Sequence, residues 1–464
     1  MTDPNPLPDP DSLAEALAYY ASFLEFRREF GRIPAVQASV FARDAVALSV
    51  AFGQADVESG TALTTAHLFR IASHSKTFTA TAIFQLVESG RLRLDDTAGT
   101  WVTGVSDGPV GGLTVRELLG HSSGLIRDGL DGDFWQLGGP FPDATRLLEI
   151  LADPSSPVID ANDRFKYSNI AYSLLGLIIE AVTGSSYATA VTSGIVDPLG
   201  LGSVGPEYDE SRAGEYATGY SSVQYSQQRR PIDHVNTGAM ASATGFYATA
   251  SDLVTYFSAH FLGDDRLLTD ASKRQMQHIA WSVPGAEGHY GLGLSVTKVG
   301  ERELVGHGGG YPGHITSSVV DPRAGLAVSV LTNCIDGPAE VLAHAGVKLI
   351  DLAGAKPRPE PGIDPARFAG RFASLWGVVD IAVLGGRLYE IAPAAADPTA
   401  VVGELEIVDE QTLKVIAGPG YASFGERYRY KFNRDGSVRS FRGGSGATLV
   451  PLGDFVLPER VSRG

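Results

Sequence analysis

Ser73 and Lys76 stand three residues apart at the start of an apolar, helix-like segment, RIASHSKTFTATAIFQLVESG. Residues at positions i and i+3 share a helix face, so the hydroxyl and the amine are expected side by side. The positive end of the helix dipole favours an alkoxide, and a lysine whose pKa is lowered by burial can act as its base. The pair therefore predicts a nucleophile and its base. The alternative is a helix capped by Ser73 or Ser75 and followed by a solvated lysine.

Two further segments carry side chains suited to the same chemistry. In RFKYSNIAYSLLGLI, Tyr167 and Asn169 precede an apolar helix. A tyrosine can share proton transfer with a lysine, and an amide can orient both a lysine and a substrate carbonyl. In LVGHGGGYPGH, His307 opens a run of three glycines, which lets the backbone approach a ligand closely. An edge strand there can offer an N–H as the second oxyanion donor, beside that of Ser73. Taken singly, the segments also fit a turn before a helix and a flexible hairpin turn.

Two motifs of other enzyme classes fail on their context. GHSSG, residues 120–124, matches the nucleophile elbow with Ser122 as nucleophile, but the elbow requires a strand before it and TVRELL is helical. A Gly-Ser-rich turn after a short helix explains it. The glycine run after His307 lacks the Lys-Ser/Thr of a phosphate-binding loop and continues into a strand.

The remaining histidines and the cysteine predict no metal site. His307 and His314 lie seven residues apart across a turn with no cysteine near them, which does not fit zinc spacing, so no metal and no cofactor are expected. Cys334 is the only cysteine and is expected to be a small core residue. Three histidines are expected to be structural or solvated, the first of them near enough to Ser73 to line a cleft: His74, His121 and His289.

The composition is that of a globular protein without a basic surface. Of 464 residues, 44% are hydrophobic, and the net charge is −16 with no block rich in Lys or Arg. Nucleic acid and membrane surfaces are therefore poor partners. The first residues lack a signal-peptide pattern and no apolar run reaches membrane-spanning length, so a soluble, cytoplasmic protein is predicted.

Strand-like and helical patterns predict an α+β domain over residues 1–354. Helical periodicity is clear in four segments: 76–89, 114–120, 170–183 and 250–262. The strand-like runs AVALSVAFG, YGLGLSV, ELVGH, HITSSVVD and LAVSVLTN lie toward the two ends of this region. We expect one antiparallel sheet built from both ends, flanked by helices and carrying a helical insertion.

The last hundred residues predict a separate all-β domain. The Pro-rich stretch 355–364, AKPRPEPGID, is typical of an extended linker. Residues 365–464 contain about eight short alternating segments separated by turn signals, including VVDIAV and RLYEIA around Gly385-Gly386. This number and spacing favour a small up-and-down antiparallel barrel.

In their order, S-x-x-K, Y-x-N and H-x-G resemble the motifs of serine hydrolases with the penicillin-binding, class C β-lactamase-like fold. The blocks LTVRELLGHSSGL, YSNIAYSLLGLIIEAVTGSSY, DPLGL, TGFYATASDLVTYF and GHGGGYPGH also resemble this family, and together they cover about residues 60 to 335. The histidine in His307-Gly308-Gly309, where the family often has Lys-Thr-Gly, resembles DD-peptidase and D-aminopeptidase members. The barrel is similar to the lipocalin-like domains of some D-aminopeptidase-type members.

The resemblance implies an acyl-enzyme mechanism. Ser73 would be the nucleophile, activated by Lys76 and Tyr167, and Asn169 would contact the substrate amide and Lys76. The N–H groups of Ser73 and Gly310 would form the oxyanion hole. His307 and Gly309 would contact the substrate; a histidine weakens the grip on a substrate carboxylate and speaks against efficient β-lactam hydrolysis.

The expected function is therefore a serine peptidase or amidase acting on a small amide or peptide, with D-amino acids a candidate class. An esterase or weak β-lactamase of the same fold is an alternative, and so is a binding or sensor protein that acylates without turnover. The expected partners are small substrates and, as an option, further copies of the chain.

Overall fold

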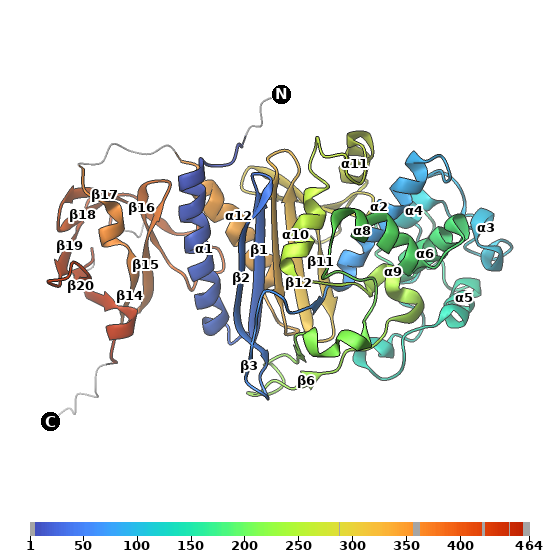
Figure 1. Cartoon of the computed structure of the whole chain (residues 1–464), viewed down its shortest axis with the longest axis horizontal. Coiled ribbons are helices and arrows are strands. Elements are labelled where there is room, and N and C mark those ends of the chain that lie inside the picture. Colours follow the sequence, from blue (N-terminus) through green and yellow to red (C-terminus); the bar gives the residue numbers. More distant parts are fainter. Residues whose placement is uncertain (1–4, 287, 356–361, 420–422, 445, 458–464) are drawn as a thin grey trace. The chain divides into compact units, whose positions relative to one another are not determined.

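The computed structural model describes residues 5–286, 288–355, 362–419, 423–444 and 446–457 (Figure 1). The described residues form two compact units. The larger unit comprises Asn5 and Arg32–Ala343, and the barrel unit comprises Pro6–Gly31 and the described residues from His344 on. Residues 356–361 of the predicted linker lie outside the described residues. The boundary at 354/365 stays a prediction, and the grouping of the first helix with the barrel was not expected.

The larger unit is built on one nine-stranded antiparallel sheet, as the sequence predicted. Its strand order is β3-β2-β1-β13-β12-β11-β10-β9-β8, so strands from the two ends of the unit meet at the pairing of β1 with β13. The strands are β1 (Ala35–Ala42), β2 (Ala45–Asp56), β3 (Thr61–Ala62), β8 (Trp281–Ser282), β9 (His289–Tyr290), β10 (Ser295–Val299), β11 (Arg302–Tyr311), β12 (His314–Asp321) and β13 (Leu326–Thr332).

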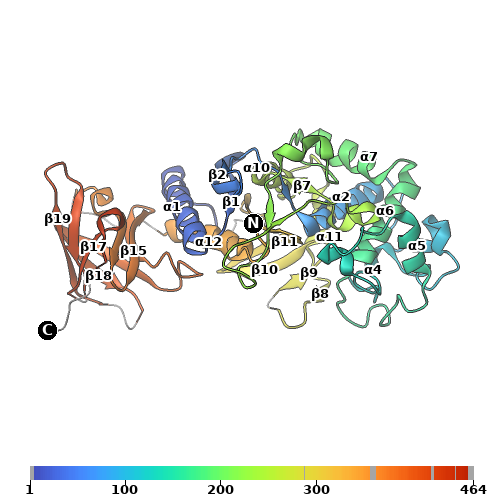
Figure 2. The same ribbon diagram turned by 90° about the horizontal axis from the view of Figure 1, so that it is seen from below.

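The segment between β3 and β8 is largely helical and lies to one side of the sheet in Figures 1 and 2. Its helices are α2 (Ser75–Glu88), α3 (Ala98–Trp101), α4 (Val115–Leu119), α5 (Ala144–Ala152), α6 (Asn169–Thr183), α7 (Tyr187–Val191), α8 (Asp197–Leu199), α9 (Ala241–Thr244), α10 (Ala250–Ser258) and α11 (Asp270–Gln277). Two short strand pairs interrupt them, β4 (Phe69–Arg70) with β7 (Tyr247–Ala248) and β5 (Gly219–Tyr220) with β6 (Pro231–Ile232).

Local signals explain where α4 begins and where α6 begins and ends. Thr114 and Glu117 form a reciprocal capping box at the start of α4. Ser168 caps α6 by accepting a hydrogen bond from the Ala171 amide, and Gly184 ends this helix in the left-handed region at φ 73°. Because α6 begins where its cap lies, Asn169 is fixed at the first turn of a buried helix.

Three element boundaries differ from the prediction. The run YGLGLSV is not one strand, because residues 291–294 form a turn between β9 and β10, with Gly293 at φ +88°. The helix predicted over 250–262 ends at Ser258. The glycines after His307 are not a flexible turn but the second half of β11, and the turn is formed by Pro312 and Gly313.

The barrel unit contains a closed up-and-down barrel, which confirms the predicted architecture. Consecutive strands pair in order and β14 closes on β21. Gly385 and Gly386, both at positive φ, form the two-residue turn between Leu384 and Arg387 that the sequence indicated. The strands are β14 (Gly370–Ser374), β15 (Gly377–Leu384), β16 (Arg387–Ile391), β17 (Val402–Asp409), β18 (Thr412–Ala417), β19 (Arg427–Phe432), β20 (Val438–Arg442) and β21 (Thr448–Pro451).

Helix α1 (Pro10–Phe30) is bound to the barrel by side-chain hydrogen bonds. The Tyr19 hydroxyl donates to Asp380 at 2.9 Å, and Arg371 donates two hydrogen bonds to the same carboxylate, at 2.8 and 2.9 Å. Arg27 donates to two backbone carbonyls of the loop that follows β16. Helix α12 (Ala339–Ala353) adds an ion pair between Lys348 and Asp397.

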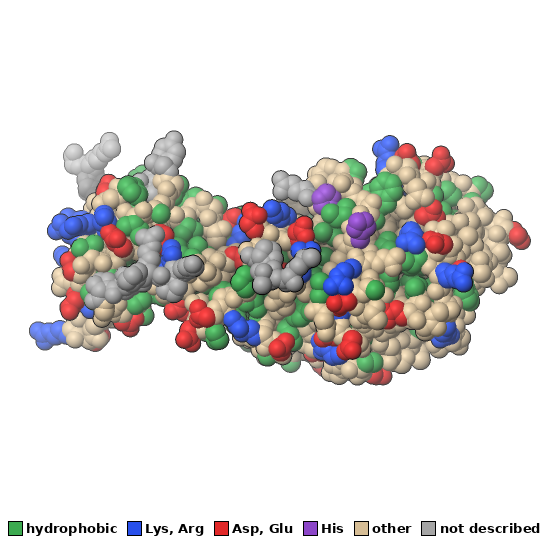
Figure 3. Space-filling model, turned by 90° about the horizontal axis from the view of Figure 1, so that it is seen from above, with side chains coloured by type: hydrophobic (Ala, Val, Ile, Leu, Met, Phe, Trp, Pro, Cys, Tyr) green, Lys and Arg blue, Asp and Glu red, His purple; other side chains and the backbone are tan. Residues whose placement is uncertain are grey.

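No single helix among the described residues is long and apolar enough to cross a membrane. Only α6 taken together with residues Tyr187–Leu199 passes the same test of length and composition, as a pair bent by 79°. On the face of the molecule shown in Figure 3, Lys and Arg side chains are interspersed with Asp and Glu, and the described residues form no continuous basic patch there.

Candidate active site

Ser73 lies in a single 3₁₀ turn, Ala72–His74, that leads directly into α2. Ala72 has φ 46°, a left-handed conformation that a residue with a Cβ rarely adopts. Neither serine caps the helix: no side chain caps the turn or α2, and the Ser75 hydroxyl donates to the Ala72 carbonyl. The capping alternative is therefore wrong, and the Ser73 side chain is left for other contacts.

The Ser73 hydroxyl contacts both predicted proton carriers. Lys76 Nζ lies 3.2 Å from Ser73 Oγ, and the Tyr167 hydroxyl lies 2.9 Å from the same oxygen. Lys76 is completely buried, while Ser73 is only half-buried. The structure thus brings the three residues into direct contact, with the serine on the accessible side.

The other contacts of Lys76 determine whether its amine donates a proton to Ser73 or accepts one from it. Nζ lies 2.7 Å from Asn169 Oδ1 and 2.8 Å from the Ala243 carbonyl oxygen on α9. Both oxygens only accept hydrogen bonds, so they take two N–H groups of the amine. A neutral amine then has its lone pair left for Ser73, the one neighbour of the three with a proton to give.

Asp128 holds Asn169 in the orientation that this arrangement requires. Asn169 Nδ2 donates to Asp128 Oδ1 at 2.6 Å, which turns Oδ1 of the amide toward Lys76. Trp135 Nε1 donates to the same carboxylate oxygen at 2.9 Å, and Arg127 Nε donates to the other at 3.0 Å. The Asn169 backbone N–H also donates to the Arg127 carbonyl at 2.8 Å. The loop after GHSSG therefore holds both the backbone and the side-chain amide of Asn169.

Burial sets the protonation of these groups. It lowers the pKa of Lys76 well below its usual 10.5; the negative charge of Asp128 opposes this shift and the positive charge of Arg127 adds to it. Burial raises the pKa of Tyr167, so its hydroxyl keeps its proton at neutral pH. The lysine is thus suited to be the base and the tyrosine a proton donor.

His307 is neutral and lies in an aromatic environment. Burial lowers its pKa to about 3. Its Nδ1 lies 2.6 Å from the Gly308 carbonyl, which only accepts, so Nδ1 carries the proton and Nε2 accepts from the Tyr290 hydroxyl at 3.1 Å. The weak binding of a substrate carboxylate at His307 stays a prediction.

The glycine half of β11 passes next to the 3₁₀ turn that carries Ser73. β10 pairs with β11 only as far as Gly306, so from His307 on one side of β11 has no partner among the described strands. A Cβ on Gly309 would lie 2.1 Å from the carbonyl oxygen of Ile71, two residues before Ser73. Gly308 and Gly310 are exposed on either side of the buried Gly309. Only a glycine permits this approach of the two backbones.

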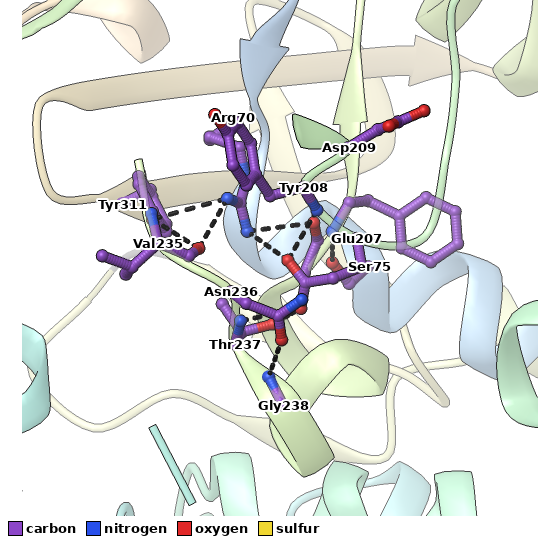
Figure 4. A network of polar contacts seen from close by, with 12 residues as sticks. Arg70, Ser75, Glu207, Tyr208, Asp209, Val235, Asn236, Thr237, Gly238 and Tyr311 are labelled. Atoms are coloured by element: carbon purple, nitrogen blue, oxygen red, sulfur yellow. Dashed lines mark hydrogen bonds and ion pairs between the residues drawn. The ribbon is translucent and has the colours of Figure 1, made fainter. Parts of the chain in front are cut away.

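Arg70, three residues before Ser73, is the centre of a network of polar contacts (Figure 4). Its guanidinium is completely buried, pairs with Glu207 at 2.8 Å and donates to the Val235 carbonyl at 2.8 Å and the Gly245 carbonyl at 3.2 Å. Its guanidinium carbon also lies 4.4 Å from the ring centre of Tyr311, the last residue of β11. One buried cation therefore links the strand that precedes the Ser73 turn to the end of β11.

The other candidates lie apart from this group. His74 is completely buried, with Nε2 3.0 Å from Ser318 Oγ, and does not line a cleft. Ser122 follows helix α4, donates to Asn162 at 3.1 Å and lines a cavity of about 500 Å³ whose walls do not include Ser73. His314 packs edge-on against Phe69. No group of three or more His, Cys, Asp or Glu side chains in the described part of the chain is arranged to hold a metal ion.

Sequence reasoning missed three groups at this site. They are the Asp128 carboxylate, the Ala243 carbonyl and the Tyr290 hydroxyl. Asp128 follows GHSSGLIR and has no local pattern of its own; only its place just after that motif offered a signal. The other two contacts depend on chain packing, since they join α9 to α2 and β9 to β11.

Comparisons with known proteins agree with this architecture. The family model described as Beta-lactamase matches residues 23–351. Penicillin-binding protein 4* of Bacillus subtilis (strain 168) is 30% identical over 290 residues, which are 59% of this chain and 63% of that protein. The chain thus spans less than two thirds of that relative.

Two solved structures are similar over most of their own length. The octameric penicillin-binding protein homologue from Pyrococcus abyssi aligns with a TM-score of 0.66 and 24% identity, over 93% of this chain and 99% of its own. A D-stereospecific amidohydrolase from Streptomyces sp. aligns with a TM-score of 0.59 and 26% identity, over 74% of this chain and 98% of its own.

Proposed function

The chain belongs to the beta-lactamase family, and on this premise we propose that it is a serine hydrolase that forms an acyl-enzyme on Ser73. We propose small amides or short peptides as its substrates, with a D-amino acid at the cleaved bond. The observation that carries this proposal is the buried Lys76 amine. Two of its three contacts accept hydrogen bonds only, and the third is the Ser73 hydroxyl.

In the acylation step, Ser73 Oγ attacks the substrate carbonyl carbon and its proton passes to the lone pair of Lys76 Nζ. The carbonyl π bond opens and its electron pair goes to the oxygen. Lys76 is then a charged ammonium group in a buried site, and burial disfavours this charge, so the release of a proton from it is favoured. The contacts with Asn169 and Ala243 keep the amine aligned with Oγ throughout.

Collapse of the tetrahedral intermediate needs a proton on the leaving nitrogen. The Tyr167 hydroxyl, whose pKa is raised by burial, lies 2.9 Å from Oγ and is placed to give its proton as the C–N bond breaks. The proton that Lys76 took from Ser73 then passes to the Tyr167 oxygen, so both groups return to their starting forms while Ser73 Oγ remains the ester oxygen. Water then attacks the ester by the same route in reverse, which releases the acid and restores Ser73.

The oxyanion would be held by the backbone N–H groups of Ser73 and Gly310. Gly310 is exposed on the half of β11 that has no strand partner on the side away from β12, and Gly309 brings this strand against the nucleophile turn. Two preorganised donors of this kind stabilise charge that develops only in the transition state.

Two observations support amides of D-amino acids over β-lactams. His307 is neutral where a cation would be needed to hold a β-lactam carboxylate, because its pKa is about 3. The similar Streptomyces protein is described as a D-stereospecific amidohydrolase. The assembly of the chain into a homo-oligomer stays a prediction.

Steady-state kinetics on matched substrates test this proposal. We expect D-alanine p-nitroanilide to be turned over at least tenfold faster than its L-enantiomer, and a penicillin more slowly than either. Ser73→Ala should lose turnover by about a thousandfold or more while its circular dichroism and melting curve stay unchanged, since Ser73 is not a helix cap. Turnover by a folded Ser73→Ala variant would refute the mechanism. A wild-type protein that forms adducts without releasing product would instead be a sensor.

A further inference from the structure

The barrel contains a cavity that the proposed reaction does not use. It has a volume of about 590 Å³ and lies among strands of the barrel itself. Its floor includes Tyr428 and Phe441, which are buried, and its rim includes Trp376, which is 93% exposed. Val401, also on the rim, is 54% exposed. The cavity is therefore open to solvent at an apolar, aromatic rim.

One acidic side chain, Glu390 on β16, lies in this cavity. Its carboxylate accepts a hydrogen bond from the Tyr428 hydroxyl, and no Lys, Arg or His of the described chain forms an ion pair with it. Burial raises the pKa of this carboxyl, because the ionised form loses water here. A carboxylate inside a barrel without a cation is costly, and its usual partner would be a positive charge.

The surroundings of Glu390 leave space beside the carboxylate. Gly403, directly across from Glu390 on β17, has no side chain; a Cβ there would be in ordinary contact with Oε2 at 3.4 Å, so the glycine leaves that space beside this oxygen unfilled. The neighbouring Tyr430 hydroxyl is buried without a partner. The rings of Tyr428, Tyr430 and Phe441 lie stacked, with centroids 4.9 to 5.5 Å apart between Phe441 and the tyrosines. A ligand here meets one negative charge and flat aromatic surfaces.

We propose that this barrel cavity binds a small primary amine with an apolar or aromatic body, whose ammonium pairs with Glu390. The ammonium replaces the water that the carboxylate lost, and the body covers the aromatic floor and the Trp376 rim. A volume of about 590 Å³ is within the usual range for pockets that bind small molecules. Anionic and neutral molecules of the same shape lack the charge that the site selects.

Calorimetric titration of the full-length protein with phenethylamine tests the charge requirement. We expect saturable binding to the wild type and at least tenfold weaker binding of 2-phenylethanol and phenylacetate. Glu390→Gln should weaken phenethylamine binding at least tenfold and leave amide hydrolysis unchanged. The matched control is Glu410→Gln, which removes an exposed carboxylate from the β17–β18 turn of the same barrel and should bind like the wild type.

A second measurement places the bound amine without relying on the folding of a variant. The chain has four tryptophans, so 5-fluorotryptophan labelling gives four ¹⁹F signals, with Trp376 assigned by Trp376→Phe. Phenethylamine should shift the Trp376 signal saturably and leave those of Trp101, Trp135 and Trp281 in place. The proposal is overturned by equal binding of the amine to Glu390→Gln, by preference for phenylacetate, by shifts confined to the other tryptophans, or by no saturation at 10 mM amine.

Discussion

At the scale of single residues, the site depends on which side chains around Ser73 can donate a proton and which can only accept one. Two neighbours of the Lys76 amine can only accept hydrogen bonds, so the lone pair of the neutral amine is left for the Ser73 hydroxyl. Burial keeps the amine neutral and keeps Tyr167 protonated, because each charged form would lose its hydration. Base and acid are thus separated by one shared oxygen, Ser73 Oγ.

This separation predicts the pH dependence of kcat/KM. Activity needs the neutral form of Lys76, so the rate should rise with pH through the lowered pKa of this amine, and this rise should lie well below the ordinary lysine value of 10.5. The raised pKa of Tyr167 means that no fall due to its deprotonation should occur below about pH 10. Initial rates from pH 4 to 10 check this. A rising limb near the ordinary lysine pKa would contradict it.

The Asp128–Arg127 pair predicts two opposite shifts of that rising limb. The negative charge of Asp128 raises the pKa of Lys76, so Asp128→Asn should move the limb to lower pH; the positive charge of Arg127 lowers it, so Arg127→Gln should move the limb to higher pH. Asp128→Asn should also lower kcat about tenfold or more, because Asn169 loses its charged acceptor. Shifts in the same direction for both variants would exclude this electrostatic role.

The sequence allowed four of the contacting residues to be predicted because local rules link them. Ser73 and Lys76 are three residues apart where a 3₁₀ turn runs into α2, and Tyr167 and Asn169 lie on either side of Ser168, the cap of α6. Asp128 could not be assigned, since its contact with Asn169 joins residues 41 positions apart and no periodicity marks it. The absence of a serine cap was also not predictable, because the 3₁₀ turn before α2 has no sequence signal of its own.

At the scale of elements, the site depends on how closely β11 approaches the turn before α2. Three glycines in sequence suggested flexibility, yet they form a regular strand paired with β12 from Gly308 to Gly310. Pairing with β12 overrides the low strand propensity of glycine. Glycine is needed here because the absence of a Cβ at Gly309 allows the close contact with the Ile71 carbonyl, and not because it makes the backbone flexible.

Two alanine substitutions separate contact from flexibility. Gly309→Ala would place its Cβ 2.1 Å from the Ile71 carbonyl oxygen and 2.5 Å from Thr316 Oγ1, so we expect a loss of about 1–3 kcal/mol in unfolding free energy and a large loss of kcat. Gly308→Ala is the control, since its nearest neighbour, the Thr316 carbonyl oxygen, is 3.6 Å away and its fold should be preserved. Denaturant unfolding of both variants measures this difference in unfolding free energy. Equal stability of the two would show that the close approach is not required.

At the scale of the whole molecule, the chain forms two units that do not follow the order of the sequence. The antiparallel sheet built from both ends of the unit and the barrel were predictable because alternation, turn glycines and strand count are local signals, whereas the strand order was not predicted. The partnership of α1 with the barrel was not, because it depends on side-chain pairs more than 350 positions apart, such as Tyr19 with Asp380. The helical pattern of α1 predicts that its apolar face is buried, but it does not predict which part of the chain covers that face.

The α1 contact predicts a stability change confined to the barrel unit. Tyr19→Phe removes the hydroxyl that donates to Asp380, so the barrel unit should lose about 1 kcal/mol of unfolding free energy. Amide hydrolysis should stay at the wild-type rate, because Ser73 and its partners lie in the larger unit. Tyr225→Phe is the control, since Tyr225 is 79% exposed. Differential scanning calorimetry with parallel kinetics measures both. An equal effect of the two substitutions would contradict the α1–barrel link.

The most direct test of the central claim is rapid-quench intact-mass spectrometry with an activated D-alanine ester, followed by peptide mapping. The account predicts a transient adduct of one acyl group per chain, located on Ser73, that decays as product appears. It predicts no adduct for Ser73→Ala and a slower approach to the adduct for Lys76→Ala. An adduct on another residue, or product release without any acyl-enzyme in a protein whose Lys76 and Ser73 are intact, would contradict it.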